Sequence, residues 1–440
     1  MEDTILTRFR TQLYTQLRPY NRADCIMDAV DALASAVGVR SPVELTLLPA
    51  FRKRHYSTLY QAVDAFRLSE STLLGLYVAH LPKQEKRGFH LFAVDTTPHP
   101  RPHARCLQDR GYVYTPQVPG NKPVTIGHRY SLLAYLPEKD PQAPAWSPFV
   151  SVRRVGTGQD PEALGCQQVR KLLEVHPAPA GDILTLGDSR YSKPCFVYPL
   201  VREKTNILVR LRCNRVVYTA PASSQGRGHP RWYGKRFALH EPASWPEPDK
   251  EAAWSGTTKK GKELVFHAQA WYDIRMRGSR SYPMHGCPFT LVRIEVRTPK
   301  GELVYSRPLW LALFGPLRQR LSLEEVYKAY LQRFDQEHGQ RLVKQKLLAT
   351  AYHTPDVEHE QHWWNMVALA YFQLWLARGL AGVVLRPWEK YLPQWRNGKS
   401  LHLSPGLIQR DFGRIIWQIG TPAHRLKPRG KPLGLSLIHI

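Results

Sequence analysis

The stretch from Tyr330 to Lys344, YLQRFDQEHGQRLVK, predicts a helix with one chemically distinctive face. Within it, Tyr330, Arg333, Glu337 and Lys344 stand at offsets of zero, three, seven and fourteen. At roughly 100° per residue, these four side chains lie within about 60° of one another on a helix. One carboxylate is therefore flanked by a phenol, a guanidinium and an ammonium group. This is the arrangement expected where a metal ion meets a nucleic-acid backbone.

The other acids of this stretch have simpler explanations. Glu324 and Glu325 lie in the first turn, where helix capping accounts for them. Asp335 points roughly 140° away from Tyr330. The remaining candidate is Glu337, for which the alternative is an ordinary surface acid paired with an arginine one helical turn away.

The composition favours a polyanionic partner. The chain has 440 residues, with 62 Lys and Arg against 36 Asp and Glu and a formal net charge of +26. This length suggests about two to three domains, and a positive charge spread along the chain favours nucleic acid over a merely basic soluble protein. The longest apolar stretch, 367–385, is interrupted by Gln373 and Arg378, so we expect no membrane span. Without a secretory signal or paired cysteines, we expect a cytosolic protein with reduced thiols.

The hydrophobic pattern changes several times along the chain. Residues 1–88 have helical periodicity and form either a DNA-end-binding module or a packing subdomain. Residues 221–307 are rich in Gly, Pro, Arg and Lys and contain short alternating segments, which predicts a β-rich module. Elsewhere the pattern predicts strands at 90–95, 127–136, 146–155, 182–188 and 206–212, and helices at 161–175, from 322 through the quoted stretch, and at 357–378.

Two further acids end predicted strands. Asp95 closes the apolar run that begins at His90, and Asp188 closes the run that begins at Asp182. If these strands are neighbours in one mixed sheet, both acids emerge at the same edge, and a helix beside that edge presents Glu337 to the same point. Oxygen ligands of this kind suit Mg²⁺. Taken singly, each aspartate is equally explained as a turn or cap residue. His99, His103 and His338 lack a convincing ligand spacing, and we expect surface or hydrogen-bonding roles for them.

Three motifs together resemble a known family. They are Phe92-Ala-Val-Asp95-Thr-Thr, Leu186-Gly-Asp188-Ser-Arg-Tyr, and the spacing Y-x2-R-x3-E-x6-K from Tyr330 to Lys344. Over about residues 50–430 the chain is similar to the DDE transposases of bacterial insertion sequences, in the group of insertion-sequence family four and its relative, family 701. This resemblance implies an α/β fold: a ribonuclease-H-like mixed sheet flanked by helices, interrupted by a β-rich insertion, with an N-terminal helical domain.

The resemblance also implies a division into domains. The expected parts are an N-terminal helical domain (1–88), a catalytic core in two pieces (89–220 and 308–390), a β-rich insertion (221–307) and a basic C-terminal segment (391–440). The final residues, LGLSLIHI, are out of character, and a truncated or misread end is the alternative to a genuine one.

The activity implied by the resemblance is cut-and-paste transposition. Asp95, Asp188 and Glu337 would bind two divalent cations, Mg²⁺ or Mn²⁺ as a substitute, for cleavage of transposon ends and strand transfer into target DNA. The expected partners are double-stranded DNA, as terminal inverted repeats and target, and a second copy of the chain in a synaptic homodimer, in the bacterial cytoplasm at the nucleoid. The residues expected to contact DNA are Tyr330, Arg333, Lys344, Arg190 and Arg341.

Two questions stay open at this point. Relatives in the family hold a flipped base on an aromatic residue of the insertion, and this chain offers four candidates there: Trp232, Trp245, Trp254 and Trp271. The alternatives to a transposase are another ribonuclease-H-like nuclease, or a domesticated or defective transposase that acts only as a DNA-binding protein.

Overall fold

The computed structural model describes residues 4–51, 55–115, 123–138, 143–222, 231–258, 261–392 and 403–424. The C-terminal residues LGLSLIHI lie outside these ranges. Among the described helices, none combines the length and the apolar character that crossing a membrane requires. The α-helices are α1 (Ile5–Leu17), α2 (Ala23–Ala34), α3 (Ser57–Ala65), α4 (Glu70–Val78), α5 (Pro161–Val175), α6 (Pro194–Arg202), α7 (Leu323–Gln332), α8 (Phe334–Lys346), α9 (Val357–Leu376) and α11 (Pro405–Ile419).

The structure contains strands in each region where the sequence predicted them, and several further short strands. They are β1 (His90–Pro100), β2 (Gly111–Tyr114), β3 (Val124–Tyr135), β4 (Phe149–Val155), β5 (Ile183–Gly187), β6 (Asn206–Leu211), β7 (Val216–Tyr218), β8 (Arg236–Ala238), β9 (Lys250–Thr257), β10 (Glu263–Ile274), β11 (Phe289–Arg297) and β12 (Leu309–Phe314). Two helix starts that the sequence predicted from capping residues were confirmed. Asp160 caps α5, because its side chain accepts the backbone N–H groups of Glu162 and Ala163, and Ser322 and Glu325 form the capping box of α7.

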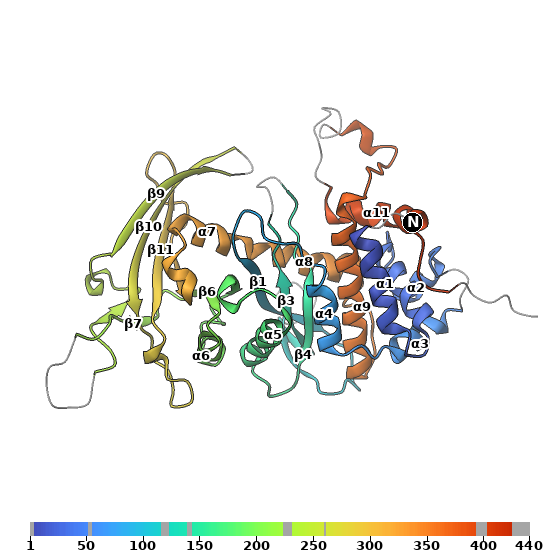
Figure 1. Cartoon of the computed structure of the whole chain (residues 1–440), viewed down its shortest axis with the longest axis horizontal. Helices are drawn as coiled ribbons and strands as arrows, with labels where there is room; N and C mark the ends of the chain where they lie inside the picture. Colours follow the sequence, from blue (N-terminus) through green and yellow to red (C-terminus); the bar gives the residue numbers. More distant parts are fainter. Residues whose placement is uncertain are drawn as a thin grey trace, which may run out of the picture.

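One mixed sheet forms the centre of the molecule (Figure 1). Its ten strands have the order β2-β3-β1-β5-β6-β12-β11-β10-β9, with β4 paired to β3. The segment β4-β3-β1-β5-β6 combines antiparallel pairing of β1 with β3 and parallel pairing of β1 with β5 and of β5 with β6. A large mixed sheet flanked by helices is consistent with the ribonuclease-H-like fold that the resemblance implied.

The strands between β6 and α7 extend this sheet. β12 pairs with β6, β11 with β12, and β10 with β11, so the region expected as a β-rich insertion continues the central sheet. Within the described residues, the short pair β7–β8 alone forms a separate sheet. The far strands β9 and β10 contact α7, which leads from this part of the sheet to α8 (Figure 1). The insertion is thereby tied to the helix that leads to Glu337.

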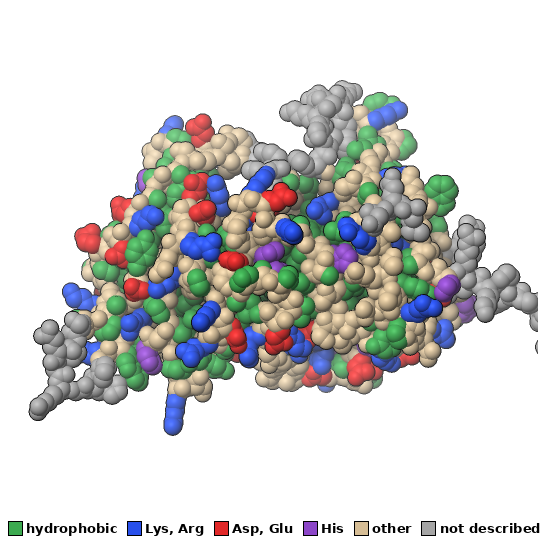
Figure 2. All heavy atoms as spheres, viewed as in Figure 1, with side chains coloured by type: hydrophobic (Ala, Val, Ile, Leu, Met, Phe, Trp, Pro, Cys, Tyr) green, Lys and Arg blue, Asp and Glu red, His purple; other side chains and the backbone are tan. Residues whose placement is uncertain are grey.

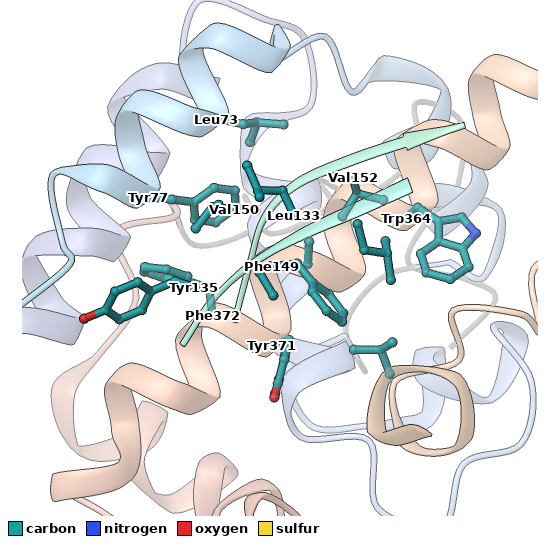
Figure 3. Packing of buried hydrophobic residues seen from close by; sticks show 14 of the residues in the cluster. Leu73, Tyr77, Leu133, Tyr135, Phe149, Val150, Val152, Trp364, Tyr371 and Phe372 are labelled. Carbon is teal, nitrogen blue, oxygen red and sulfur yellow. The ribbon is translucent and has the colours of Figure 1, made fainter. Parts of the chain in front are cut away.

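The N-terminal helices share one hydrophobic core with α5, α6 and α9 on one side of the sheet, and a second core lies on the side of α7. α1, α2, α3 and α4 all contact either α9 or the strand β4 that α9 covers. Figure 3 shows this packing, in which α4, β3, β4 and α9 contribute the labelled side chains Leu73, Tyr77, Leu133, Tyr135, Phe149, Val150, Val152, Trp364, Tyr371 and Phe372. A buried ion pair of Arg10 with Asp31, and a hydrogen bond from Arg10 to Gln373 (2.6 Å), join α1 and α2 to α9. These contacts pack the helices of residues 1–88 against the core, while binding of a DNA end by them stays a prediction.

Two expectations about the elements were wrong. Asp95 does not end its strand, because β1 continues to Pro100 through antiparallel pairing with β3. The helix expected to run unbroken through Glu337 is two helices, α7 and α8, which meet at Arg333. Glu337 therefore lies in the first turn of α8 and not in the middle of a long helix.

Candidate active site

The register of two parallel strands brings Asp95 and Asp188 together. Ala93 of β1 is level with Leu186 of β5, and continuing this register by two residues places Asp188 beside Asp95. Neighbouring strands are about 4.8 Å apart. The two acids also share a face of the sheet, because alternate residues point the same way. Leu91 and Ala93 before Asp95, like Leu184 and Leu186 before Asp188, belong to the core on the side of α7.

The junction of α7 and α8 brings the third acid to this face. Arg333, at the junction, is 8% exposed, and its guanidinium group reaches two of the three acids. Its Nη2 donates to Glu337 Oε1 over 3.2 Å, and its Nη1 lies 4.0 Å from Asp95 Oδ2. Burial lowers the pKa of Arg333, but the negative charges of Tyr330 (when ionised), Asp95, Glu337 and Asp188 outweigh this effect and raise the pKa. Arg333 is thus the cation around which the three predicted acids are arranged.

The acids are suited to a hard cation by their chemistry. Burial raises the pKa of Asp95, and the charge of Asp188 raises it further, while Arg333 lowers it. A bound cation would relieve this repulsion, and carboxylate oxygens are the ligands that Mg²⁺ and Mn²⁺ prefer. Within the described residues, however, no three His, Cys, Asp or Glu side chains enclose a point that an ion fits. The donor set therefore fits a divalent cation in kind, and the guanidinium group of Arg333 faces two of its three carboxylates, those of Asp95 and Glu337.

Gln340 is a site residue that the sequence analysis missed. It follows Glu337 by three residues on α8, and its Nε2 donates to Asp95 Oδ2 over 3.2 Å. The other oxygen of Asp95 accepts the Thr96 N–H over 2.8 Å. The helical spacing from Arg333, seven residues, was the available signal, because it places Gln340 on the same face. Gln340 orients the partly buried carboxylate of Asp95.

Tyr330 does not face a substrate groove. It is 2% exposed and belongs to the core between α7 and the sheet, and burial raises its pKa. The Arg333 guanidinium lies 5.8 Å from the centre of the Tyr330 ring and 4.8 Å from that of Phe334. The expectation that Tyr330 contacts DNA directly is therefore wrong for this structure, because the phenol packs beneath Arg333 and supports it.

Lys344 lies on the same side of α8 and reaches the end of β1. Its Nζ donates to the Pro98 carbonyl oxygen over 2.9 Å. Burial lowers the pKa of Lys344 to about 8, although the charge of Asp95 acts in the opposite direction. Lys344 is thus a half-buried cation close to the acids, and its charge is sensitive to pH near neutrality.

The two remaining predicted DNA contacts are at the surface. The Nε of Arg190 donates to Glu162 Oε1 over 3.0 Å, and its backbone N–H donates to Asp188 Oδ1 over 2.8 Å. Arg190 therefore orients Asp188 through its backbone while its half-exposed side chain is tied to α5. Arg341 is exposed on α8, one turn beyond Glu337, and has no ion pair within the described residues.

The four tryptophans of the insertion differ sharply in burial. Trp271 is 2% exposed, and Trp245 packs against it. Trp254 is partly buried and stacks on Phe266 beside α7. Trp232 is the most accessible, 47% exposed, with its ring stacked on His285. Trp245 is partly buried like Trp254, so burial excludes Trp271 alone and leaves Trp232, Trp245 and Trp254 as the candidates for contact with a base.

A buried cluster holds the end of β1 beyond Asp95. Glu360 of α9 is fully buried and accepts hydrogen bonds from His99 (3.1 Å), His128 (2.9 Å), Tyr130 (2.7 Å) and Arg101 (3.1 Å). Burial alone would raise the pKa of Glu360, but the hydrogen bonds from His128 and His99 hold it well below its usual range. His99 thus has the hydrogen-bonding role expected for it.

A protein-family model matches more than half of the chain, including two of the three acids. The family model described as DDE superfamily endonuclease matches residues 12–277, which is more than half of the 440 residues and includes Asp95 and Asp188. The chain belongs to the DDE superfamily endonucleases. Comparison with curated proteins gives no match.

Membership in the DDE superfamily endonucleases has two consequences for the site. Such nucleases typically use divalent metal ions, and the family implies a DNA substrate. The match stops at residue 277, before α7 and α8, so it does not extend to Glu337. The place of Glu337 in the site depends on its geometry: it is held by the arginine that also faces Asp95.

Proposed function

We propose that this DDE endonuclease is the transposase of a bacterial insertion sequence, of family four or the related family 701, and that it cuts transposon ends and joins them to target DNA. The observation that carries the proposal is the convergence of Asp95, Asp188 and Glu337 around Arg333. The spacing from Tyr330 to Lys344 supports the particular group. The excess of basic residues, 62 against 36 acidic ones, supports a DNA partner.

Each residue of the site has a role that follows from its surroundings. Asp95, Asp188 and Glu337 would hold two Mg²⁺ ions, or Mn²⁺ in their place, and Gln340 and the Arg190 N–H orient the two aspartates. Bound divalent cations supply activation of a water or 3′-hydroxyl and stabilisation of the leaving oxygen. Arg333 can turn from the acids to a DNA phosphate and bind it in a bidentate manner. Lys344 adds a point charge next to the backbone, and Tyr330 supports Arg333 from below.

The protein would act as a homodimer on terminal inverted repeats in the bacterial cytoplasm at the nucleoid. A synapse holds two ends at once, so two copies of the active site are needed. We also propose the domain division with the core in two pieces (89–220 and 308–390) around the insertion (221–307); its support is that β9, β10 and β11 all lie beyond β12 in the sheet order.

The test is end cleavage by purified protein. DNA that carries the element's own ends, incubated with Mg²⁺ or Mn²⁺, should be cut at those ends. Asp95→Asn, Asp188→Asn and Glu337→Gln should each reduce cleavage by at least about a thousandfold, since loss of a catalytic group typically costs this much or more. End binding should be retained. The matched control is Asp335→Asn, a buried acid in the same first turn of α8.

Two results would contradict the proposal. Undiminished cleavage by Glu337→Gln would remove that residue from the site. Cleavage of any DNA without preference for the element's ends would instead indicate a general nuclease of the same fold.

A further inference from the structure

Arg210 is an exposed cation one strand away from the acids of the site. It belongs to β6, which pairs in parallel with β5, and Gly187 of β5 is level with Val209 of β6. Continuing this register by one residue places Arg210 beside Asp188, and neighbouring strands are about 4.8 Å apart. Across the strands β1, β5 and β6, the residues Asp95, Asp188 and Arg210 therefore lie side by side.

Arg210 also lies on the same face of the sheet as the acids. Alternate residues of a strand point to the same side, and Leu208, two residues earlier, belongs to the core on the side of α7. The intervening residue, Val209, belongs to the core on the other side. Burial raises the pKa of Tyr330 on α7, while the charges of Arg333 and Arg210 lower it. The guanidinium group of Arg210 is thus within electrostatic reach of the helix that ends at Arg333.

The charge of Arg210 is not neutralised by an acid within the residues that the structure describes. Arg190 and Arg333, by contrast, are engaged. Arg190 donates to Glu162 Oε1 over 3.0 Å, and Arg333 donates to Glu337 Oε1 over 3.2 Å. Arg210 can therefore bind a phosphate without first breaking an ion pair, and a guanidinium group binds phosphate in a bidentate manner.

Arg210 and Arg333 flank the acids on different sides. Arg333 lies 3.2 Å from Glu337 and 4.0 Å from Asp95. Arg210 lies beyond Asp188, because β5 separates β6 from β1 in the sheet. A DNA backbone whose scissile phosphate meets the acids would therefore pass both arginines.

The spacing of the strands indicates which phosphate Arg210 would meet. One strand spacing is about 4.8 Å, and each nucleotide of a DNA strand rises by about 3.4 Å. Arg210 would thus face a phosphate one or two positions from the one at the acids. Figure 2 shows Lys and Arg side chains along the hollowed upper side of the molecule, over the region that α7 and α8 cross in Figure 1, so the surface around the acids suits a polyanion.

We infer that Arg210 binds a DNA backbone phosphate one or two positions from the phosphate that is cut, on the Asp188 side of the site. The inference deepens the proposed function and rests on it, since it takes the cut to occur at the three acids. The contact is independent of base sequence, because phosphate contacts position DNA without discriminating its bases. With Arg333 on the Glu337 side, Arg210 would hold the backbone on both sides of the scissile bond and align that bond with the acids.

The first experiment measures single-turnover cleavage of the element's own ends at saturating protein. Arg210→Ala should lower the rate about 100-fold, since a misplacement of about 1 Å can cost this much. Arg210→Lys should recover part of the loss, because it keeps the charge without the planar fork. The matched control is Arg202→Ala, an exposed arginine of α6, the helix that packs on the opposite face of the sheet, and it should cleave like the wild type.

Three results of this experiment would overturn the inference. The first is a wild-type rate in Arg210→Ala, and the second is an equal loss of rate in Arg202→Ala. The third is a slower Arg210→Ala that also unfolds at a lower temperature and is not rescued by Arg210→Lys, because this combination indicates a structural role. Since Arg210 is exposed, thermal unfolding of both Arg210 variants should match that of the wild type.

The second experiment locates the contact with a scan of neutral methylphosphonates around the cut. Each duplex carries one such group, and binding is measured by anisotropy in the Asp95→Asn protein, which leaves the DNA uncut. One substitution within two positions of the cut should weaken binding about tenfold, the value of a charge-assisted hydrogen bond. The same substitution should weaken binding no further when Arg210→Ala is added. Equal losses at every position with and without Arg210 would refute the placement.

A failure of this contact and a failure of the proposed function give different results. If the chain is a general nuclease, the wild type cuts DNA without preference for the element's ends, and Arg210→Ala still cuts any duplex more slowly. If Arg210 makes no contact with DNA, the wild type cuts at the ends and Arg210→Ala cuts there equally fast.

Discussion

Arg333 leads to a sharp prediction, because its guanidinium group contacts two of the carboxylates that would hold a divalent cation. Arg333→Gln should increase the affinity of the DNA-free protein for Mn²⁺. The guanidinium lies 3.2 Å from Glu337 and 4.0 Å from Asp95, so an ion can be held by these carboxylates only after the guanidinium leaves them. In the wild type, a DNA phosphate would draw Arg333 away, and metal binding would then follow DNA binding.

The magnitude follows from Coulomb's law. Two unit charges 4 Å apart attract by about 4 kcal/mol at an effective dielectric constant of about 20. Screening at the half-exposed Glu337 and the desolvation of the buried guanidinium offset much of this attraction. A remaining difference of about 1.4–2.8 kcal/mol corresponds to a decrease in the Mn²⁺ dissociation constant of about 10- to 100-fold.

The assay is isothermal titration calorimetry with Mn²⁺ at fixed ionic strength. Arg341→Gln is the matched control, because it removes the same charge from the same helix without touching the acids, and its affinity should stay within about twofold of the wild type. Adding Asp95→Asn to Arg333→Gln should abolish the gain. A dissociation constant that is unchanged or higher in Arg333→Gln would refute the reasoning and show that Arg333 does not compete with the ion.

Three further predictions concern residues around the acids. Since burial lowers the pKa of Lys344 to about 8, its ammonium group loses its proton as the pH rises through 8. DNA affinity, measured by anisotropy, should therefore fall about tenfold between pH 7 and pH 9 in the wild type but not in Lys344→Arg. The same decrease with pH in both proteins would exclude a contact of Lys344 with DNA. Glu360→Gln leaves Arg101 without its buried counter-ion and should cost about 3 kcal/mol in urea unfolding, whereas a cost below about 1 kcal/mol would show that the cluster is not a charged one. A Cβ at position 339 would lie 2.2 Å from Ser147 Oγ, so Gly339→Ala should lower stability by about 1–3 kcal/mol and slow cleavage. Adding Ser147→Ala should restore part of both, and no recovery would show that the strain lies elsewhere.

Much of the fold was predictable because local signals were strong. The cap at Asp160 and the capping box at Ser322 marked helix starts correctly, since both depend on hydrogen bonds within one turn. The apolar runs before Asp95 and Asp188 predicted buried strands, and these strands pair in parallel as the site required. The end of β1 was misplaced because its continuation to Pro100 depends on pairing with β3, a contact that local sequence does not contain.

The candidate site was predictable in its residues but not in their burial. Helical spacing selected Arg333, Glu337 and Lys344, and all three lie near Asp95 or the end of its strand. The same spacing placed Tyr330 with them, although its side chain is buried. Helical periodicity predicts the direction of a side chain around the helix axis, but it does not predict which other elements cover that side chain.

By itself, the sequence determined the types of the elements, the excess of positive charge and the three acids, because these depend on residue identity and short-range spacing. Only the tertiary structure decided that Arg333 lies among the acids, that Gln340 orients Asp95 and that the strands beyond β6 extend one sheet. These features depend on contacts between segments more than a hundred residues apart, such as that of Gln340 with Asp95. A contact of this kind forms when the packing of α7 and α8 on the sheet excludes water from both partners, and the burial of the whole core determines that packing.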